Sequence, residues 1–548
     1  MEFWGSWSIW LAVFGGLAAL VALMKKVNGW LYESGLGEKK YDLPPGDMGW
    51  PLIGNMWEFL TAFKSGYPDN FITSFVKRFS RTGIYKAFMF GSPTVMVTIP
   101  DTCKQVLMDD DNFRPGWPEA THKLIGRKSF VGLPHEEHRW IRKLTAAPVN
   151  GHEALSVYLE FIDGVVVLAL EKWCKMGEIE FLTELRRLTF RIITHIFLSA
   201  EGDPVMATLE KEYTDLNYGV RAMAINLPGF AYYRALKARK KLVAVLQSVL
   251  AKRREEKARG IERPKKDMMD QLIEVQDENG RRLNDEEIID VLIMYLNAGH
   301  ESSGHTTMFA TVFLQENPEF FEKAKAEQEQ ILKNRPPGQK GLSFKEYRQM
   351  EYLSKVIDET LRVVNFSSVV FREATSDVNI NGYTIPKGWK VQVWFRNVHM
   401  DPEVYPDPKE FNPDRWDTYT PKAGAFIPFG AGSRLCPGND LAKMEISIFL
   451  HHFLLGYQLK RKNPNSPMRY LPHPRPIDNC LATVTKFDAL ESCILYWNFY
   501  LTALLWLIRI LKTEDLSPGQ NLRDILLLDA GNACLSKSQQ KQIVLGRK

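Results

Sequence analysis

A single cysteine in a glycine-rich turn is the residue of this sequence best suited to chemistry. Cys436 lies in the segment FGAGSRLCPG, residues 429–438, and a helical pattern follows it directly. Glycine and proline make the turn rigid and place Cys436 near a helix N-terminus. That position, together with the neighbouring Arg434, favours the thiolate form. A thiolate can act as a nucleophile or as a metal ligand.

The surrounding sequence decides between these two roles. No arrangement of histidine and asparagine marks a cysteine protease, and no second cysteine lies close enough in sequence for a zinc site. A lone thiolate in a turn lined by glycine suits a haem iron, where thiolate donation favours cleavage of the O–O bond. We therefore predict that Cys436 is the axial ligand of a haem.

The pattern F-x-x-G-x-R-x-C-x-G is identified as the cysteine-ligand loop of the cytochrome P450 superfamily. The sequence matches it at Phe429, Gly432, Arg434, Cys436 and Gly438. The resemblance implies the cytochrome P450 fold, mostly α with a small β portion, and a haem b cofactor that reacts with dioxygen. It also implies a partner, NADPH–cytochrome P450 reductase, whose flavins pass electrons from NADPH to the haem.

A second motif resembles the E-x-x-R of that family. Glu359 and Arg362 in ETLR are three residues apart, so they share one face of a predicted helix and can form a charge-assisted pair. The resemblance adds Arg415, in PDRW, as a third member. It implies a structural role for the three residues, in support of the haem pocket.

A third motif, AGHESS at residues 298–303, is similar to the family's [AG]-G-x-[DE]-T-[TS]. Its glycine inside a long predicted helix indicates a distorted turn with room for dioxygen. The resemblance implies that Glu301 and Ser302 relay protons as the catalytic residues. Serine stands where the family has threonine, so the hydroxyl is kept. The other interpretation of Ser302 is a hydrogen bond back to a helix carbonyl.

Four side chains are expected to hold the haem propionates. HRWIRK, residues 138–143, resembles the family's W-x-x-x-R, with His138 in place of tryptophan. His138 and Arg142 share a helix face, and the other interpretation of His138 is an ordinary surface histidine. Arg372 in FREA and Arg434 look like further propionate partners by their positions in the family pattern.

The remaining sequence must position these residues, and its periodicity predicts a mostly helical body. Helices are expected at 152–176, 232–257, 285–314, 318–334 and 350–363, and strands within 84–99 and 378–395. With 45% hydrophobic and 25% charged residues the composition is that of a globular protein, which excludes general disorder. A net charge of +5 without a basic stripe gives no reason to expect nucleic-acid binding.

The chain opens with an uncharged apolar segment at residues 3–24. About 22 helical residues span ~30 Å, the hydrocarbon core of a bilayer. Lys25 and Lys26 follow, which places the downstream chain on the cytosolic side. A cleaved signal peptide would carry its basic residues before a shorter apolar run, and a buried core helix is the other alternative.

We therefore predict four regions. Residues 1–26 form a single-pass membrane anchor, 27–55 a spacer rich in proline and glycine, 56–487 the haem-thiolate monooxygenase domain, and 488–548 an atypical tail. The resemblance implies the endoplasmic reticulum membrane, with the catalytic domain facing the cytosol. In the tail, residues 494–511 are apolar but contain Asn498 and Arg509. The tail has two interpretations. One is a second transmembrane helix; the other, which we favour, is a product of alternative splicing or of an imperfect gene model.

Several longer stretches closely resemble one branch of the superfamily, the plant ent-kaurenoic acid oxidases: LPPGDMGWPLIGN, LNAGHESSGHTTMFATVFLQENP, VNINGYTIPKGW and LPHPRPIDNCLA. The resemblance implies three oxidations of ent-kaurenoic acid, by way of a hydroxy acid and gibberellin-12 aldehyde, to gibberellin-12. Candidate cations for the carboxylate of this hydrophobic diterpene acid are Lys123, Arg127 and Lys128. The alternatives are a triterpene (beta-amyrin-type) oxidase of the same plant clan, a haem-thiolate isomerase or dehydratase, and a non-catalytic membrane-bound haem protein.

Overall fold

The computed structural model describes residues 2–199, 204–220, 222–261 and 266–487. The tail at 488–548, with its predicted second span, lies outside the described residues. The chain divides into two compact units, one made of Met1–Leu455 and Leu459–Val484, the other of Gly456–Gln458 and Thr485–Lys548. The residues discussed below as functional candidates all belong to the first unit.

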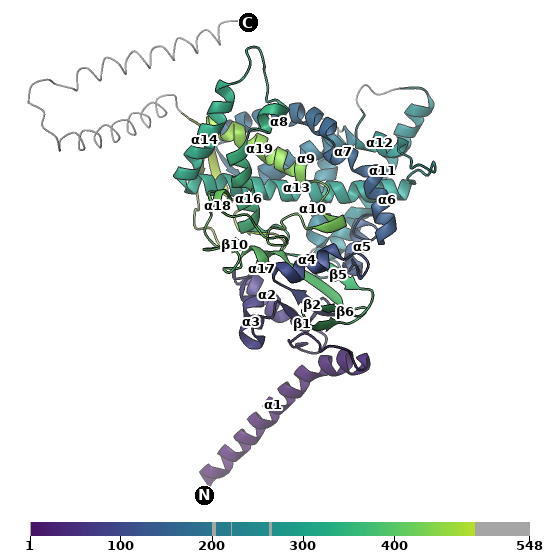
Figure 1. The fold of residues 1–548 in the computed structure, drawn as a ribbon, viewed down its shortest axis with the longest axis vertical. Coiled ribbons are helices and arrows are strands. Elements are labelled where there is room, and N and C mark those ends of the chain that lie inside the picture. Colours follow the sequence, from purple (N-terminus) through teal and green to yellow (C-terminus); the bar gives the residue numbers. More distant parts are fainter. Residues whose placement is uncertain (1, 200–203, 221, 262–265, 488–548) are drawn as a thin grey trace, which may run out of the picture. The chain divides into compact units, whose positions relative to one another are not determined.

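Helices make up most of the described chain (Figure 1). They are α1 (Glu2–Glu33), α2 (Met56–Lys64), α3 (Asn70–Phe79), α4 (Pro100–Met108), α5 (Glu119–Ile125), α6 (His135–Thr145), α7 (Ala147–Asn150), α8 (His152–Met176), α9 (Phe181–Leu198), α10 (Pro204–Val220), α11 (Ala231–Ala258), α12 (Met268–Glu274), α13 (Asp285–Glu316), α14 (Pro318–Lys333), α15 (Phe344–Tyr347), α16 (Glu351–Val364), α17 (Phe395–His399), α18 (Arg415–Thr418) and α19 (Asn439–Gly456). Five of them, α8, α11, α13, α14 and α16, confirm the helices expected from periodicity to within two residues at each end.

The long helix α13 is central to the helical part, where it packs against α9, α11, α14 and α16. Asn284 caps its start, since its side chain accepts a hydrogen bond from the Glu287 amide and the Glu287 carboxylate accepts one from the Asn284 amide. The helix continues without interruption through the AGHESS motif, so the distorted turn expected there does not form as a break. Gly299 instead permits close packing, because a Cβ there would lie 3.0 Å from Ile193 Cδ1 of α9.

The strands form one larger sheet in the order β1 (Ile84–Met89), β2 (Ser92–Val97), β8 (Lys390–Trp394), β5 (Val369–Ala374) and β3 (Phe113–Pro115). Only the β2–β8 pair is parallel. Alternate residues face two separate cores. One core contains Phe88, Val95 and Val393, and the other contains Tyr85 and Met96 with side chains of α2 and α3. Helix α4 packs against strand β8 of this sheet, and Figure 1 shows it next to the strands.

The smaller sheets are β4 (Glu178–Glu180) with β12 (Leu481–Lys486) and β9 (Tyr457–Arg461), β6 (Val378–Ile380) with β7 (Tyr383–Ile385), and the hairpin of β10 (Met468–Arg469) and β11 (Arg475–Pro476). The hairpin pairs Arg469 with Arg475. The fold is thus mostly α with a small β portion, as the sequence predicts.

The N-terminal helix α1 continues past the predicted end of the anchor at residue 26, as far as Glu33. By length and composition, the stretch Trp10–Leu36 could cross a membrane, and its apolar window is not buried in the protein. The last turns of α1 are tied to the body. Asn28 donates to the carbonyls of Met48 (2.9 Å) and Trp50 (2.6 Å), and Lys86 of β1 pairs with Glu33 at 2.8 Å. These contacts explain why the helix extends into the predicted spacer.

Candidate active site

The loop that carries Cys436 is fixed by backbone contacts. Gly432 adopts φ +72°, and a Cβ there would lie 2.4 Å from the Leu107 carbonyl oxygen at the end of α4, so only glycine fits. The Cys436 amide donates to the Phe429 carbonyl at 2.9 Å. The loop ends at Gly438, and α19 begins at the next residue, Asn439. Cys436 therefore lies close to the N-terminus of α19, as predicted.

The protonation of Cys436 differs from the expectation. Burial raises the pKa of its thiol, and the amide of Gly438 and the charge of Arg142 only partly oppose this. Arg434 points elsewhere, because it donates to the carbonyls of Phe130 (3.2 Å) and Leu133 (3.1 Å). Helix N-terminus and cation therefore do not outweigh desolvation. A coordinated metal ion deprotonates a thiol outright.

The four predicted propionate partners come together from α6, β5 and the cysteine loop. Burial lowers the pKa of His138 to about 3, and Arg434, Arg142 and Arg372 act in the same direction. Burial and the neighbouring Arg372 lower the pKa of Arg434 to about 10. Burial also lowers the pKa of Arg372, which only Asp110 offsets. These shifts indicate that His138, Arg372 and Arg434 lie in one desolvated cluster with excess positive charge. Arg142 is half-buried and close enough to act on His138 and Arg434.

This cluster has no ion-paired anion among the described residues, although Asp110 is near enough to act on Arg372 and Arg434. None of the described carboxylates lies within ion-pair distance of Arg142, Arg372 or Arg434, and the buried atoms Arg434 Nε and His138 Nδ1 have no hydrogen-bond partner there. Buried cations require an anionic partner. Two carboxylates of a haem would supply one, and Cys436 would supply the axial thiolate. The donor set therefore fits a haem.

Glu359, Arg362 and Arg415 form a second buried cluster. Glu359 and Arg362 are both 0% exposed, and Arg362 donates to Glu359 through Nε (2.9 Å) and Nη2 (2.7 Å). Arg362 also donates to the carbonyls of His399, Pro408 and Glu410, at 2.9, 2.7 and 3.0 Å. Arg415 Nε reaches Glu359 at 3.4 Å. The cluster thus joins α16 to the irregular segment that precedes the cysteine loop.

Glu301 and Ser302 face different surroundings although they are neighbours on α13. Ser302 is partly exposed and Ala298 is exposed, in a helix whose other residues are mostly buried, so open space lies beside this turn. The Ser302 hydroxyl donates to the Ala298 carbonyl at 2.9 Å, the back-bonded arrangement named as its alternative. Tyr295, two turns earlier, is close enough to feel the charges of Cys436 and Arg142. This face of α13 is therefore the one nearest the cysteine.

Glu301 is buried and forms an ion pair with Arg186 of α9, whose Nε lies 2.8 Å from Oε1. Burial alone raises its pKa, but a hydrogen bond from His300 and the charge of Arg186 outweigh this and hold the pKa well below its usual range. Glu301 is thus an anion held away from Ser302. The sequence gives no signal for Arg186, because its partner lies far along the chain.

Glu445 of α19 is a buried carboxyl that the motifs do not reveal. It is 3% exposed, and burial raises its pKa to about 8, which the hydroxyl of Ser303 only partly opposes. The proton is therefore kept in the folded protein at neutral pH.

A prediction for stability follows from Glu445. Between its ordinary pKa of 4.5 and about 8 the folded state holds a proton that the unfolded state has lost, so this carboxyl lowers stability as pH rises. Glu445→Gln removes this dependence. Between pH 5 and pH 8 we expect the unfolding free energy of this variant to gain a few kcal/mol relative to that of the wild type. Its thermal midpoint should rise accordingly. Glu319→Gln alters an exposed side chain, so its difference in stability from the wild type should be the same at pH 5 and pH 8. If the effect of Glu445→Gln did not depend on pH, the raised pKa of Glu445 would be contradicted.

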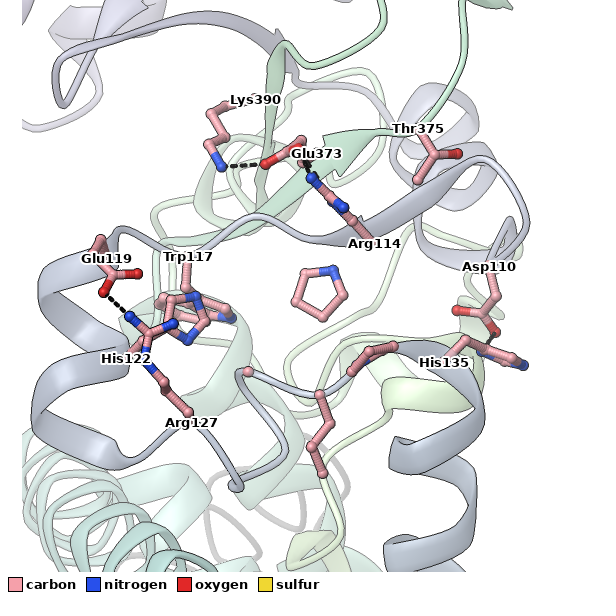
Figure 2. Close-up of a pocket in the computed structure, with 14 residues that line it drawn as sticks. Asp110, Arg114, Trp117, Glu119, His122, Arg127, His135, Glu373, Thr375 and Lys390 are labelled. Carbon is pink, nitrogen blue, oxygen red and sulfur yellow. Dashed lines mark hydrogen bonds and ion pairs between the residues drawn. The ribbon is translucent and has the colours of Figure 1, made fainter.

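A cavity of about 560 Å³ lies beside the propionate cluster and contains Arg127, one of the candidate cations for a substrate carboxylate. Figure 2 shows that its charges are already paired. Arg127 bonds to Glu119, and both Arg114 and Lys390 bond to Glu373. The other candidates, Lys123 and Lys128, do not line it. The structure therefore does not bring the three candidates together as an anion site.

Residues 44–480 match the Cytochrome P450 family, and the chain belongs to that family. It is a haem-thiolate monooxygenase, an oxidoreductase that works with a redox partner on a hydrophobic substrate. The chain is 66% identical over 471 residues to ent-kaurenoic acid oxidase 1 of Arabidopsis thaliana, which covers 86% of this chain and 96% of that protein.

Two further proteins are similar to the chain. A 7,8-epoxymelianol synthase of Ailanthus altissima is 53% identical over 490 residues, covering 89% of this chain and 98% of that protein. Among solved structures, retinoic acid-bound cyanobacterial CYP120A1 is similar with a TM-score of 0.72 and 27% identity, over 82% of this chain and all of that one. Fold and family thus agree with the geometry around Cys436.

Proposed function

We propose that this protein oxidises ent-kaurenoic acid in three steps, by way of a hydroxy acid and gibberellin-12 aldehyde, to gibberellin-12 in gibberellin biosynthesis. The single observation that carries this proposal is the 66% identity to ent-kaurenoic acid oxidase 1 across 96% of that protein. The triterpene alternative is less favoured, since the 7,8-epoxymelianol synthase is only 53% identical. A haem-thiolate isomerase or dehydratase would dispense with the buried acid at Glu301.

The roles of the site residues belong to the same proposal. A bound haem would supply the activation of dioxygen, at an iron that a thiolate holds. Cys436 provides that thiolate. Side chains of three segments hold the propionates: His138, Arg142, Arg372 and Arg434. Their excess of positive charge in a largely buried cluster supports this role. The Glu359, Arg362 and Arg415 cluster fixes the segment before the loop.

Glu301 and Ser302 move protons toward the reacting centre. Ser302 lies on the open face of α13, while Glu301 is held by Arg186. A proton can pass from Glu301 to Ser302 only when the Glu301 side chain takes up a proton and leaves Arg186, or when a water connects the two groups.

A variant tests the role of Glu301. Glu301→Gln keeps the shape of the side chain and removes its charge, so we expect a normal haem spectrum with turnover lowered by roughly 100-fold or more, as for loss of a proton-transfer group. Product formed per NADPH consumed should fall as well. Glu319→Gln serves as the control with full turnover. Unchanged turnover in Glu301→Gln would exclude this residue from proton delivery.

The cellular setting completes the proposal. Residues 1–26 anchor the protein in the endoplasmic reticulum membrane as a single span, and 27–55 connect it to a catalytic domain at 56–487 on the cytosolic side. NADPH–cytochrome P450 reductase in the same membrane supplies electrons. The apolar and unburied stretch Trp10–Leu36 supports the anchor.

The substrate is tested in microsomes that contain the protein and a reductase. We expect NADPH-dependent conversion of ent-kaurenoic acid to the hydroxy acid, the aldehyde and gibberellin-12, and no conversion of a triterpene supplied in parallel. Conversion of the triterpene alone would overturn the substrate. Rearrangement without NADPH would favour an isomerase.

A further inference from the structure

Arg475, on strand β11, is a buried arginine without an acidic partner among the described residues. Its exposed fraction is 9%. Its guanidinium carbon lies 5.4 Å from the centroid of the Tyr218 ring on α10, a cation–π contact. Burial lowers the pKa of Arg475, a sign that its charge is poorly compensated. An arginine in this condition destabilises a protein unless an anion joins it.

The neighbouring charges do not supply that anion. Glu301 of α13 is close enough to act on Arg475, but its carboxylate is bound by Arg186. The positive charges of Arg186 and Arg469 repel that of Arg475 and lower its pKa further. Glu301 is therefore the one carboxylate near two guanidinium groups, only one of which it pairs with, and the region beside Glu301 carries an excess positive charge.

Other buried arginines have partners that explain them. Arg253 pairs with Asp267 and Asp270, each at 2.6 Å. Arg362 pairs with Glu359 at 2.7 Å. The cluster at Arg372 and Arg434 is explained by the haem propionates. Arg475 differs from all of these, since neither the fold nor the haem accounts for its charge.

Three rings from separate segments lie close to Arg475 in sequence or in contact with one another. His473, two residues before Arg475, stacks on Phe366 with ring centroids 3.9 Å apart. His305 of α13 also contacts Phe366, at 5.3 Å, and burial lowers the pKa of His305 to about 4, which keeps it neutral. A buried cation without its own carboxylate, near the rings of Phe366 and the neutral His305, matches a ligand with a hydrocarbon body and one carboxylate.

We propose that Arg475 binds the carboxylate of the substrate and thereby determines specificity for a diterpene acid. The inference rests on the proposed function and adds the residue that recognises the acid group. A guanidinium can hold a carboxylate by two parallel hydrogen bonds, which fixes the direction of a rigid ring system. Because the hydroxy acid formed first retains this carboxylate, the same anchor serves the successive oxidations. Arg475 is thus a positioning residue, while the reacting carbon lies elsewhere on the skeleton.

Binding spectra of the full-length, haem-loaded protein in membranes test the proposal. The probes are ent-kaurenoic acid and its methyl ester, which has the same skeleton without the charge. In the wild type the acid should bind more tightly than the ester. In Arg475→Gln the acid should bind roughly 10- to 100-fold more weakly, as expected for loss of charge-assisted hydrogen bonds, and the ester should bind as before. Arg475→Lys should recover part of the affinity for the acid.

Arg282→Gln is the control, since Arg282 is exposed, lies in the loop that precedes α13 and is not among the charges that act on Arg475. It should bind both probes as the wild type does, and the reduced carbon monoxide spectrum should show intact haem in every variant. Equal loss of acid and ester in Arg475→Gln, or no loss of either, would overturn the role of Arg475 while leaving the proposed function intact. Failure of the wild type to bind the acid would instead overturn the proposed function and this role with it.

Discussion

A Cys436→Ala variant is expected to lose the red-shifted Soret band of the reduced carbon monoxide complex and all monooxygenase turnover. Cys436 lies in a loop that Gly432 and the hydrogen bond to Phe429 hold rigidly at the start of α19. No other described cysteine lies in this loop, and a neighbouring side chain cannot move in to replace it. The loss should therefore be complete, since thiolate donation is what the shifted band reports.

A second cysteine provides the control. Cys103 is 0% exposed and lies in the core beside the large sheet, so Cys103→Ala creates a small cavity without touching the loop. It should cost about 1 kcal/mol of stability and keep the full band. A Cys436→Ala protein that retains the shifted band would refute the ligand assignment.

An Arg362→Lys variant is expected to lower stability by about 3 kcal/mol or more, since each buried carbonyl oxygen left without its donor costs roughly 1–3 kcal/mol. Lysine keeps the charge but cannot reach Glu359 and three carbonyls at once, as Arg362 does. Because these carbonyls belong to the segment leading to the cysteine loop, haem retention should fall with stability. Haem content per polypeptide and thermal unfolding measure the two effects.

Glu359→Gln tests the same cluster from the other side and should behave similarly, since it leaves Arg362 without its anion. Glu351→Gln, at the exposed start of the same helix, is the control and should retain haem fully. Full haem content and an unchanged unfolding midpoint in Arg362→Lys would show that the cluster does not support the pocket.

Local patterns in the sequence predicted those parts of the site whose geometry is local. The spacing of Glu359 and Arg362 places both on one helix face, and glycine at position 432 marks a turn that no other residue can enter. Helix bounds followed from hydrophobic periodicity for the same reason. In each case the interacting atoms are a few residues apart, so the sequence contains the geometry.

Contacts between distant segments could not be predicted in this way. Arg186 meets Glu301 only because α9 packs against α13 through Gly299, and nothing in either segment indicates the other. The same applies to Arg475, which faces Tyr218 across two separate elements. The sequence made Arg127 a candidate cation for the substrate carboxylate, but in the structure it pairs with Glu119, eight residues earlier. Burial and pairing, which decide these cases, arise only when the chain folds.

The ties between α1 and the body have a mechanical consequence. A free tether would let the catalytic body tumble above the lipid surface, whereas Asn28 and Glu33 join the end of α1 directly to the chain at Met48 and Lys86. If α1 is the membrane anchor, these contacts would limit how far the body can turn relative to the lipid surface. A substrate dissolved in the lipid would accordingly meet the same side of the enzyme at each encounter.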